Sequence, residues 1–433
     1  MTIPLMGRAG LKIRAVDGFE ELGHPEILST PLFYHANPGD KLTLSDDAYK
    51  FNVATYRPEI DERWLYTYAY APDQSWTNYN HDLSGDSYRQ GEYTFEENVY
   101  FRICLRKVNG EIFDGTEDIN DILTFLTSTL QRKSKPWISA EVQRISKHVN
   151  EQKKPDSTIL LLLTDTHYTV NGTWEDTIQA IDMLSQEISL DGIIHLGDMT
   201  DGLVTGEVTR HYVRIMLDAL KRNGIPVWVT IGNHDTNYFQ NNTERFTCLQ
   251  QSKLYNNKDD IRFYIDISGF RLIFLDSYDP DEQQRYGYNK ECIKWLTKTL
   301  EGIQENCKAI VFSHLPPITR LQFWTNAIRG EKELIEVLNQ HKNKIYAWIN
   351  GHNHADRLDN EEGFPIISIT NAKCEAFYER KTEGFITPYR KLGEVSQEAF
   401  DIVILNKSNE EARFIRFGAG KDRHISNRKV EWV

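Results

Sequence analysis

Apolar and polar residues alternate in short runs from Pro31 to Gly110, with turn residues between the runs. Such runs are typical of half-buried β-strands in antiparallel sheets. The runs are KLTLS (41–45), YKFNVATY (49–56), RWLYTYAYA (63–71) and EYTFEENVYFRICLRKV (92–108), the last followed by the hairpin signal Asn109-Gly110. The pattern predicts a small all-β domain, similar to a β-sandwich, over residues 1–115.

Aromatic residues are dense in this first region: Trp64, Tyr66, Tyr68, Tyr70, Trp76, Tyr79 and Tyr93. Alternating Tyr and Trp on one face are more typical of a sheet core than of a binding surface. A surface that stacks on sugars is the alternative interpretation, and it gives the module a possible role in binding or assembly.

The pattern changes between residues 116 and 157. The stretch EDINDILTFLTSTL, from Glu117 to Leu130, indicates a helix, and NEQKKPDS, from Asn150 to Ser157, is polar and contains a proline. A charged segment with a proline makes no core. We therefore predict a helical and polar linker over residues 116–157.

Beyond Thr158, continuous apolar runs alternate with helical stretches. The predicted strands are ILLLLT (159–164), GIIHLG (192–197), IPVWVTIG (225–232), RFYIDI (262–267), RLIFLDS (271–277), KAIVFSH (308–314) and IYAWIN (345–350). The predicted helices are Trp174 to Ser189, Glu207 to Arg222, Asn289 to Leu300 and Glu331 to His341. Apolar runs without alternation indicate sheets buried on both faces, as in layered α/β folds. The later runs FPIISIT (364–370), FDIVILN (400–406) and EARFIRFG (411–418) are expected to complete a second sheet, so residues 158–433 form a second domain.

Composition narrows the classes of function. The chain has 433 residues and a formal net charge of -13, which disfavours non-specific nucleic-acid binding because that binding needs Lys and Arg at the phosphates. Its five cysteines show no paired spacing that would indicate a thiolate zinc site or a disulfide framework. The N-terminus lacks the apolar run of a secretory signal, and no stretch approaches the length of a membrane span. We expect a cytoplasmic or virion-associated protein.

Polar side chains follow five of the predicted strands. They are Asp165-Thr166-His167, Asp198-Met199-Thr200-Asp201, Asn233-His234-Asp235, His314 and Gly351-His352-Asn353-His354. Any one of these motifs, taken alone, is usually a turn or a helix cap. His195 lies inside an apolar strand, where a histidine is more often a core residue than a metal ligand. Because ligands bind at the carboxyl ends of strands in open α/β sheets, the five loops are expected to meet in one crevice. So many carboxylates and imidazoles together require cations to neutralise them.

This series of motifs resembles the signature of calcineurin-like metallophosphoesterases, especially the cyclic-nucleotide phosphodiesterase-like branch, and it covers about Ile159 to Asp356. The C-terminal stretch from Phe400 is also similar to members from phage and Gram-positive bacteria. The resemblance implies a four-layer αββα sandwich with two metal ions at the strand ends. It implies that Asp165, His167 and His354 hold the first metal, that Asn233, His314 and His352 hold the second, and that Asp198 bridges both.

The ligand types carry information of their own. Mixed carboxylate, amide and imidazole ligands suit Mn, Fe or Zn, whereas an all-oxygen set would suit Mg or Ca. Two such cations favour attack on phosphorus by a hydroxide held between them. The resemblance implies that His234 donates a proton to the leaving oxygen. Asp235 is predicted to orient His234, and Asp201 to support the metal ligands.

We therefore predict a dinuclear metallophosphoesterase, and more specifically a phosphodiesterase, that acts on a phosphate ester such as a cell-wall or other surface phosphodiester. The protein-phosphatase branch typically has an Arg after the second Asp of the second motif, where this chain has Gly202, which argues against protein phosphatase activity. Two alternatives stay open. One is a virion or surface protein that binds glycan through its first module, and the other is an intracellular cyclic-nucleotide phosphodiesterase. Near the C-terminus, Arg423 is expected to be solvated rather than to contact substrate.

Overall fold

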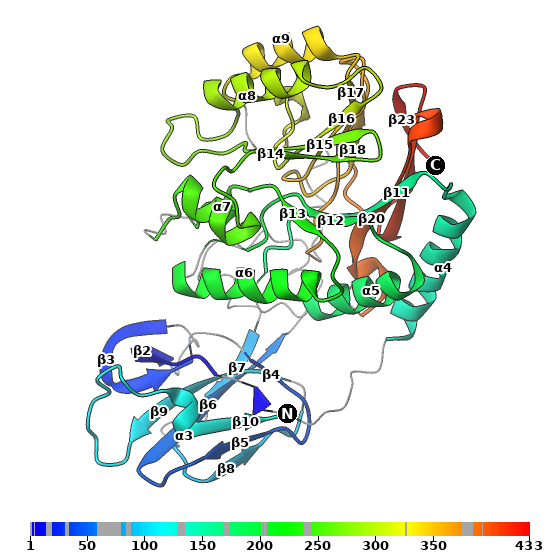
Figure 1. The fold of residues 1–433 in the computed structure, drawn as a ribbon. Helices are drawn as coiled ribbons and strands as arrows, with labels where there is room; N and C mark the ends of the chain where they lie inside the picture. Colours follow the sequence, from blue (N-terminus) through cyan, green and yellow to red (C-terminus); the bar gives the residue numbers. More distant parts are fainter. Residues whose placement is uncertain are drawn as a thin grey trace. The chain divides into compact units, whose positions relative to one another are not determined.

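The structure is a computed structural model that describes residues 2–3, 5–13, 20–30, 34–58, 79–83, 88–97, 99–127, 135–168, 173–200, 202, 206–237, 244–324, 327–373, 384–391 and 393–433. These residues fall into two compact units, residues 2–127 and residues 135–433 (Figure 1). The aromatic run 63–71 lies outside the described residues, and so does the expectation that it forms a core or binds sugar. Within the described ranges, no helix is both long and apolar enough to cross a membrane.

The first unit is built from two antiparallel sheets, with strand orders β1-β10-β5-β8 and β2-β3-β9-β6-β7, and β4 also pairs with β9. The strands are β1 Thr2–Ile3, β2 Arg8–Ile13, β3 Glu20–Ser29, β4 Tyr34–Ala36, β5 Lys41–Leu44, β6 Tyr49–Pro58, β7 Tyr79–Leu83, β8 Glu92–Thr94, β9 Val99–Lys107 and β10 Leu123–Leu126. One buried core takes side chains from both sheets, with the ring of Phe101 on β9 4.9 Å from that of Phe125 on β10. The predicted smaller β domain is confirmed.

Two local predictions in this unit are wrong. Of the described residues in the stretch from Glu117, only α3, Ile119–Ile122, is helical, and the chain continues as strand β10. The reason lies in the alternation there, since Leu123 and Phe125 are buried, whereas Thr124 is partly exposed and Leu126 is exposed. The Asn109-Gly110 signal does not make a hairpin, because β9 pairs with β3, β4 and β6 whereas β10 pairs with β1 and β5.

The second unit has two mixed sheets. The larger has the order β13-β12-β11-β20-β21-β22-β23, in which β11, β12 and β13 are parallel, and the smaller has the order β14-β15-β16-β17-β19-β18, in which β15, β16, β17 and β19 are parallel. The strands are β11 Ser157–Leu163, β12 Gly192–His195, β13 Val227–Val229, β14 Phe263–Ile267, β15 Phe270–Leu275, β16 Lys308–Ser313, β17 Ile345–Asn350, β18 Arg357–Asp359, β19 Ile366–Ser368, β20 Ala399–Asn406, β21 Glu411–Gly418, β22 Arg423–Ser426 and β23 Lys429–Trp432.

Six α-helices are described in this unit. They are α4 Pro136–Gln152, α5 Trp174–Glu187, α6 Gly206–Lys221, α7 Cys248–Asn256, α8 Lys290–Glu301 and α9 Glu331–His341, with short 3-10 turns η1 His234–Thr236, η2 Thr319–Leu321, η3 Val395–Gln397 and η4 Lys407–Asn409. The seven predicted strands and four predicted helices of this region are all present, with ends shifted by a few residues. The predicted placement of the late strands is wrong in part, because only β19 joins the sheet of β17 whereas β20 and β21 extend the sheet of β11.

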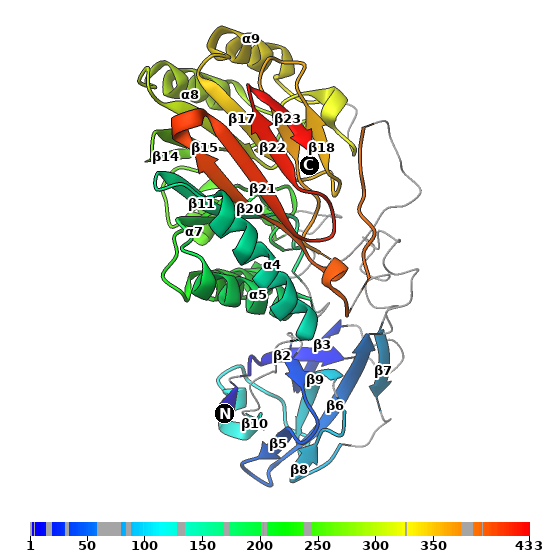
Figure 2. The ribbon, with the colours of Figure 1, turned by 90° about the vertical axis from the view of Figure 1, so that its right-hand side faces the viewer.

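The layers follow from the two faces of each strand. Along β11, Leu160 and Leu162 pack between the two sheets with Phe312 of β16, whereas Leu161 and Leu163 pack on the outer face with α4 and α5. The outer face of the smaller sheet packs against α8 and α9. Helices therefore cover both outer faces of two stacked sheets (Figure 2), which is the predicted four-layer αββα architecture.

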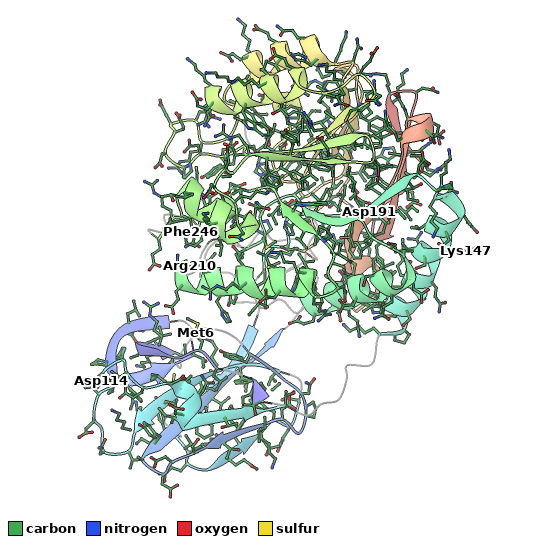
Figure 3. All side chains as sticks on the ribbon, in the orientation of Figure 1. Met6, Asp114, Lys147, Asp191, Arg210 and Phe246 are labelled. Carbon is green, nitrogen blue, oxygen red and sulfur yellow. The ribbon has the colours of Figure 1, made fainter. Side chains whose placement is uncertain are left out.

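Helix α4 occupies residues that the sequence pattern suggested as linker. Its inner face buries Ile138, Val142, Ile145 and Val149 in the core of the second unit, while Lys147 on its outer face is 74% exposed (Figure 3). The Glu141 carboxylate accepts a hydrogen bond from Gly418 N at 3.0 Å, at the end of β21. The polar residues of this stretch are thus the solvent face of an amphipathic helix.

Candidate metal centre

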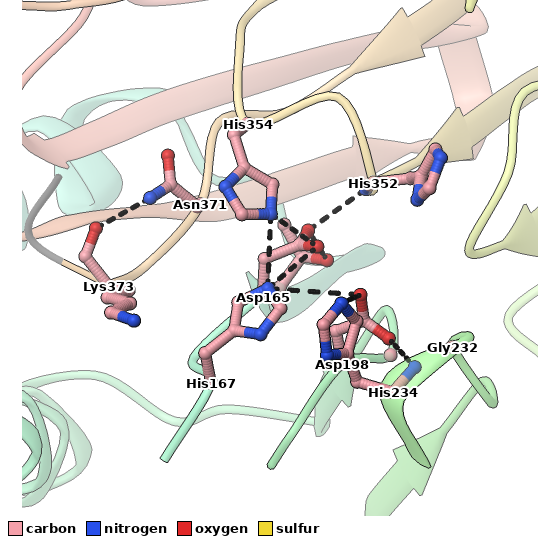
Figure 4. A network of polar contacts seen from close by, with 12 residues as sticks. Asp165, His167, Asp198, Gly232, His234, His352, His354, Asn371 and Lys373 are labelled. Carbon is pink, nitrogen blue, oxygen red and sulfur yellow. Dashed lines mark hydrogen bonds and ion pairs between the residues drawn. The ribbon is translucent and has the colours of Figure 1, made fainter. Parts of the chain in front are cut away.

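Five loops that follow strands meet at one edge of the second unit. Strands β11, β12 and β13 of the larger sheet and β16 and β17 of the smaller sheet each end immediately before or close to one predicted motif. Parallel neighbours end at the same edge, so the loops after them converge. Figure 4 shows Asp165 and His167, both on the loop after β11, turned toward His354 on the loop after β17.

The backbone is unusual at these loops. Asp165, His167, Asp198, His352 and His354 all have positive φ, between 40° and 67°. Non-glycine residues rarely adopt this region, and they are found there most often where surrounding structure enforces it at functional sites. Five of the seven predicted metal ligands thus have a backbone shaped to direct their side chains inward.

Three overlapping groups of side chains could each hold a metal ion. They are Asp165, His167 and His354; His167, Asp198 and His234; and Asp198, His314 and His352, with ligand atoms within 4.8 Å of one another in each group. Nitrogen atoms face each other closely, 3.1 Å between His167 Nε2 and His354 Nε2 and 3.1 Å between His314 Nε2 and His352 Nδ1. All these residues are at least 96% buried.

Asn233 completes the set that the sequence predicts. Its Oδ1 lies 3.2 Å from His314 Nε2, and that same nitrogen lies 3.1 Å from Asp198 Oδ2. The structure therefore brings all seven predicted ligand residues together. It also places His234 within the cluster, with its Nε2 3.9 Å from Asp198 Oδ2.

Two observations indicate that the residues fit cations. Asp165 Oδ1 and His352 Nε2 are buried and make no hydrogen bond among the described residues, although such atoms normally have a partner. Burial on its own would lower the pKa of His314, but the charges of Asp198 and Asp165 raise that pKa to about 9. The two carboxylates thus favour a positive charge at this position, and a metal ion can supply it.

The His314 ring is fixed by its other nitrogen. Its Nδ1 donates to Leu196 O at 2.8 Å, so the lone pair of a neutral ring lies on Nε2, toward Asp198 and Asn233. Metal-binding histidines are commonly held this way. His195 is different, because its Nδ1 accepts from Gly197 N and its Nε2 contacts Thr166 Oγ1 at 3.0 Å. Burial lowers the pKa of His195 to about 3, which fits the core histidine that the sequence predicts.

Asp235 has partners other than the predicted His234 ring. Its carboxylate accepts hydrogen bonds from the backbone N–H groups of Asp198 (2.8 Å), Met199 (2.9 Å) and Gly232 (2.9 Å) and from the Tyr255 hydroxyl (2.9 Å). Burial, followed by the charge of Asp198, raises the pKa of Asp235 to about 6. These contacts hold the loop that carries Asp198. Tyr255, on α7, had no signal in the sequence because it lies outside every motif.

A second set of contacts supports the His352 loop. Asn353 Nδ2 donates to Leu321 O at 2.9 Å and Phe323 N donates to Asn353 Oδ1 at 3.0 Å. The Trp324 indole donates to His352 O at 2.8 Å, and its ring centre lies 6.0 Å from that of His354. The Tyr286 ring lies 5.6 Å from the His352 ring. Trp324 and Tyr286 are partly exposed loop residues, and only their positions in three dimensions connect them with the site.

The local backbone explains why a glycine stands at position 202. It has a φ of 66°, and a Cβ at this position would lie 2.3 Å from the carbonyl oxygen of His234. A side chain of any kind would therefore displace the loop that carries His234. Asp201, predicted to support the metal ligands, lies outside the described residues.

The fold and the site together define a two-sheet α/β domain with a buried carboxylate and imidazole centre at its strand ends. Residues 159–356 match the sequence model of the calcineurin-like phosphoesterases. This match spans the whole series of motifs, as the sequence pattern predicted, and it supports a metal-dependent phosphoesterase domain in this part of the chain. Among curated proteins no sequence matches.

Three solved structures that match part of this chain have low sequence identity to it. A dimetal phosphatase from Danio rerio is 16% identical, with a TM-score of 0.45, and covers 62% of this chain and 98% of its own. GAP50, the anchor in the inner membrane complex of Plasmodium, is 11% identical (TM-score 0.38, 64% and 88%). The phosphopantetheinyl hydrolase from Mycobacterium tuberculosis is 13% identical (TM-score 0.35, 53% and 95%).

Proposed function

We propose that the second unit is a dinuclear phosphodiesterase. In this proposal Asp165, His167 and His354 hold one transition metal ion, Asn233, His314 and His352 hold the other, and Asp198 is shared. The observation that carries the proposal is the convergence of these buried side chains in overlapping groups, with Asp198 common to two of them. Mn, Fe and Zn are the metals that suit this mixture of ligands.

When bound, two such ions lower the pKa of water and neutralise charge on the phosphoryl oxygens. The chain's own residues hold and orient the reacting groups. Asp198 is fixed through Oδ1, which accepts the His234 N–H at 2.8 Å, so that Oδ2 faces the His314 side of the centre. The shared carboxylate and the backbone of the proton donor are therefore positioned by one contact.

His234 is the proposed proton donor to the leaving oxygen. Its ring lies edge-on to the His167 ring, with centres 4.6 Å apart, and it is 98% buried. A protonated imidazole next to the Asp198 carboxylate is electrostatically favoured. An imidazole can therefore hold a proton at the edge of the centre and release it to an alkoxide as the ester bond breaks.

A diester is favoured over a monoester by the aromatic side chains beside the centre. Trp324 and Tyr286 offer apolar surface next to His354 and His352, which suits an organic substituent that stays on the phosphate. Candidate substrates are cell-wall or other surface phosphodiesters and cyclic nucleotides. Rates of hydrolysis measured on a panel of these phosphodiesters would distinguish among them.

The test is metal analysis together with hydrolysis of bis-p-nitrophenyl phosphate. We expect two equivalents of Mn or Zn in the wild-type protein, and loss of both metal and activity in Asp198→Asn. Asp266→Asn is the matched control, since Asp266 pairs with Arg271 on the surface, away from the centre. Full activity with at most one equivalent of metal, or an Asp198→Asn variant that behaves like Asp266→Asn, would overturn the proposal.

A further inference from the structure

Four charged side chains form a buried ionic cluster beside the metal-binding loop after β17. They are Asp356, which follows His354 by two residues, Asp401 on β20, Arg416 on β21 and Arg423 on β22. Each is at most 2% exposed. We call these four residues the ionic cluster.

Each aspartate of the ionic cluster contacts both arginines. Arg416 binds Asp356 through two hydrogen bonds, from Nη2 to Oδ1 at 2.8 Å and from Nη1 to Oδ2 at 3.0 Å, and its Nε donates to Asp401 Oδ1 at 2.8 Å. Arg423 Nη1 donates to Asp356 Oδ1 at 3.2 Å, and Arg423 also pairs with Asp401. The expectation that Arg423 is solvated is therefore wrong, because its side chain is buried in the cluster. Its guanidinium pairs with the two aspartates and is not placed to contact substrate.

The ionic cluster has no net charge, but burying its four charged groups costs desolvation free energy. Taking four charges out of water costs several kcal/mol per ion before pairing, and apolar residues of similar volume are often as stabilising as a buried ion pair. Burial opposes ionisation of Asp401, yet the charges of Arg416 and Arg423 hold its pKa below the ordinary value. A cluster of this kind is best explained by what it positions.

Hydrogen bonds through Thr370 connect the ionic cluster with His354, one of the proposed metal ligands. Asp356 Oδ1 accepts a hydrogen bond from Thr370 N at 3.0 Å, and Thr370 Oγ1 donates to His354 O at 3.2 Å. Asp356 N also donates to Ile386 O at 2.8 Å. Asp356 is thus fixed on its backbone and on its carboxylate, while its neighbour His354 has a φ of 52° that the surrounding structure must enforce.

We propose that the ionic cluster positions the His352–His354 loop for metal binding by tying it to strands β20, β21 and β22 of the other sheet. The two sheets each supply part of the proposed centre, and the cluster fixes the loop of the smaller sheet against the larger one. Arg416 is the main positioning residue, because it alone binds Asp356 with two parallel hydrogen bonds, a geometry that Lys cannot reproduce. This inference rests on the metal centre proposed above.

The test compares metal affinity with stability. Arg416→Met leaves Asp356 with one arginine, and we expect the dissociation constant for Mn or Zn, measured by chelator competition on folded protein, to rise about tenfold or more. Arg416→Lys retains the charge without the bidentate pair and should give a smaller increase. Asp401→Asn weakens the anchor of both arginines without touching the loop, and should also weaken metal binding.

A core variant provides the control. Leu296→Ala removes a fully buried side chain from the core between α8 and the smaller sheet, in the same unit, and should lower the unfolding temperature of the metal-free protein with unchanged metal affinity. If Arg416→Met does not fold, Arg416→Lys and Asp401→Asn carry the comparison.

Two results would overturn the inference while leaving the proposed function intact. One is wild-type metal affinity in the folded cluster variants, and the other is equal loss of affinity in Leu296→Ala at the same loss of stability. Failure of the wild-type protein to bind metal would instead remove the proposed function itself.

Discussion

His234 is held through its backbone, whereas its ring stands at the edge of the proposed centre. We expect His234→Ala to retain both metals and to lower the turnover of alkyl phosphodiesters by about 10²- to 10⁴-fold, the usual contribution of a general acid. Esters with a p-nitrophenolate leaving group should lose less than about tenfold, because that leaving group needs no proton. Steady-state kinetics on both types of ester, with metal content measured in parallel, make the comparison. Equal losses would indicate electrostatic stabilisation, and loss of metal would identify His234 as a ligand.

Asp235 and Tyr255 allow a graded test of loop positioning. Asp235→Asn places an amide donor against the N–H of Met199 if it replaces Oδ1, or against the N–H groups of Asp198 and Gly232 if it replaces Oδ2, and each buried donor left unsatisfied costs about 1–3 kcal/mol. We expect its unfolding free energy to fall by about 2–4 kcal/mol and its metal occupancy to fall too. Tyr255→Phe removes one hydrogen bond to the Asp235 carboxylate, leaves its backbone donors in place, and should cost about 1.5–3 kcal/mol. Denaturant unfolding and metal analysis measure both effects, and a fully stable, metal-loaded but inactive Asp235→Asn would favour a direct catalytic role.

Glu398, buried between η3 and β20, links stability to pH. Burial, followed by the charge of Asp176, raises its pKa from 4.5 to about 7, although Thr177 and Gln397 donate hydrogen bonds to its carboxylate. A raised folded-state pKa means that the contribution to stability is complete below about pH 4.5 and is lost as pH rises to about 7. Relative to Glu398→Gln, the wild-type protein should lose about 3 kcal/mol over that range. Parallel curves of unfolding free energy against pH for the two proteins would contradict this assignment.

At the scale of elements, the sequence predicts best where a run is buried on both faces. Strands such as β11 and β17 are continuous apolar runs, and the sequence pattern predicts them together with the proposed ligands that follow them. Pairing is harder to predict, since β20 is equally apolar but its place beside β11 depends on register between residues more than 200 positions apart. The residues proposed to support the site, among them Tyr255, Trp324 and Arg416, are dispersed in the chain, so their roles depend on packing that no local pattern encodes.

Helix α4 is a second element whose role depends on packing and not on local sequence pattern. Its solvent face resembles a linker, but its four buried aliphatic side chains contribute about 1.5–3 kcal/mol each, which together rival the 5–15 kcal/mol that stabilises a typical domain. We therefore expect a fragment of residues 134–433 to fold cooperatively and a fragment of residues 153–433 to be unfolded or insoluble. Circular dichroism and thermal unfolding of both fragments make the test. Similar unfolding temperatures would show that α4 is dispensable.

At the scale of the whole molecule, the two units are expected to have different functions. All the proposed metal ligands and His234 lie between Asp165 and His354, in the second unit. We predict that the boundary between functional domains coincides with the boundary between the two compact units rather than with the start of β11.

The fragment of residues 134–433 should therefore bind two metals and hydrolyse small diesters within about twofold of the full-length rate. On a polymeric cell-wall phosphodiester it should be less efficient, if the first unit holds the enzyme on the polymer, because tethering raises the effective concentration of substrate without altering the active site. Kinetics of both proteins on bis-p-nitrophenyl phosphate and on a cell-wall preparation, with added free first unit as the control for tethering, distinguish the possibilities. Equal efficiency on the polymer would exclude a targeting role for the first unit. A folded, metal-loaded fragment that is inactive on small diesters would mean that the first unit completes the active site.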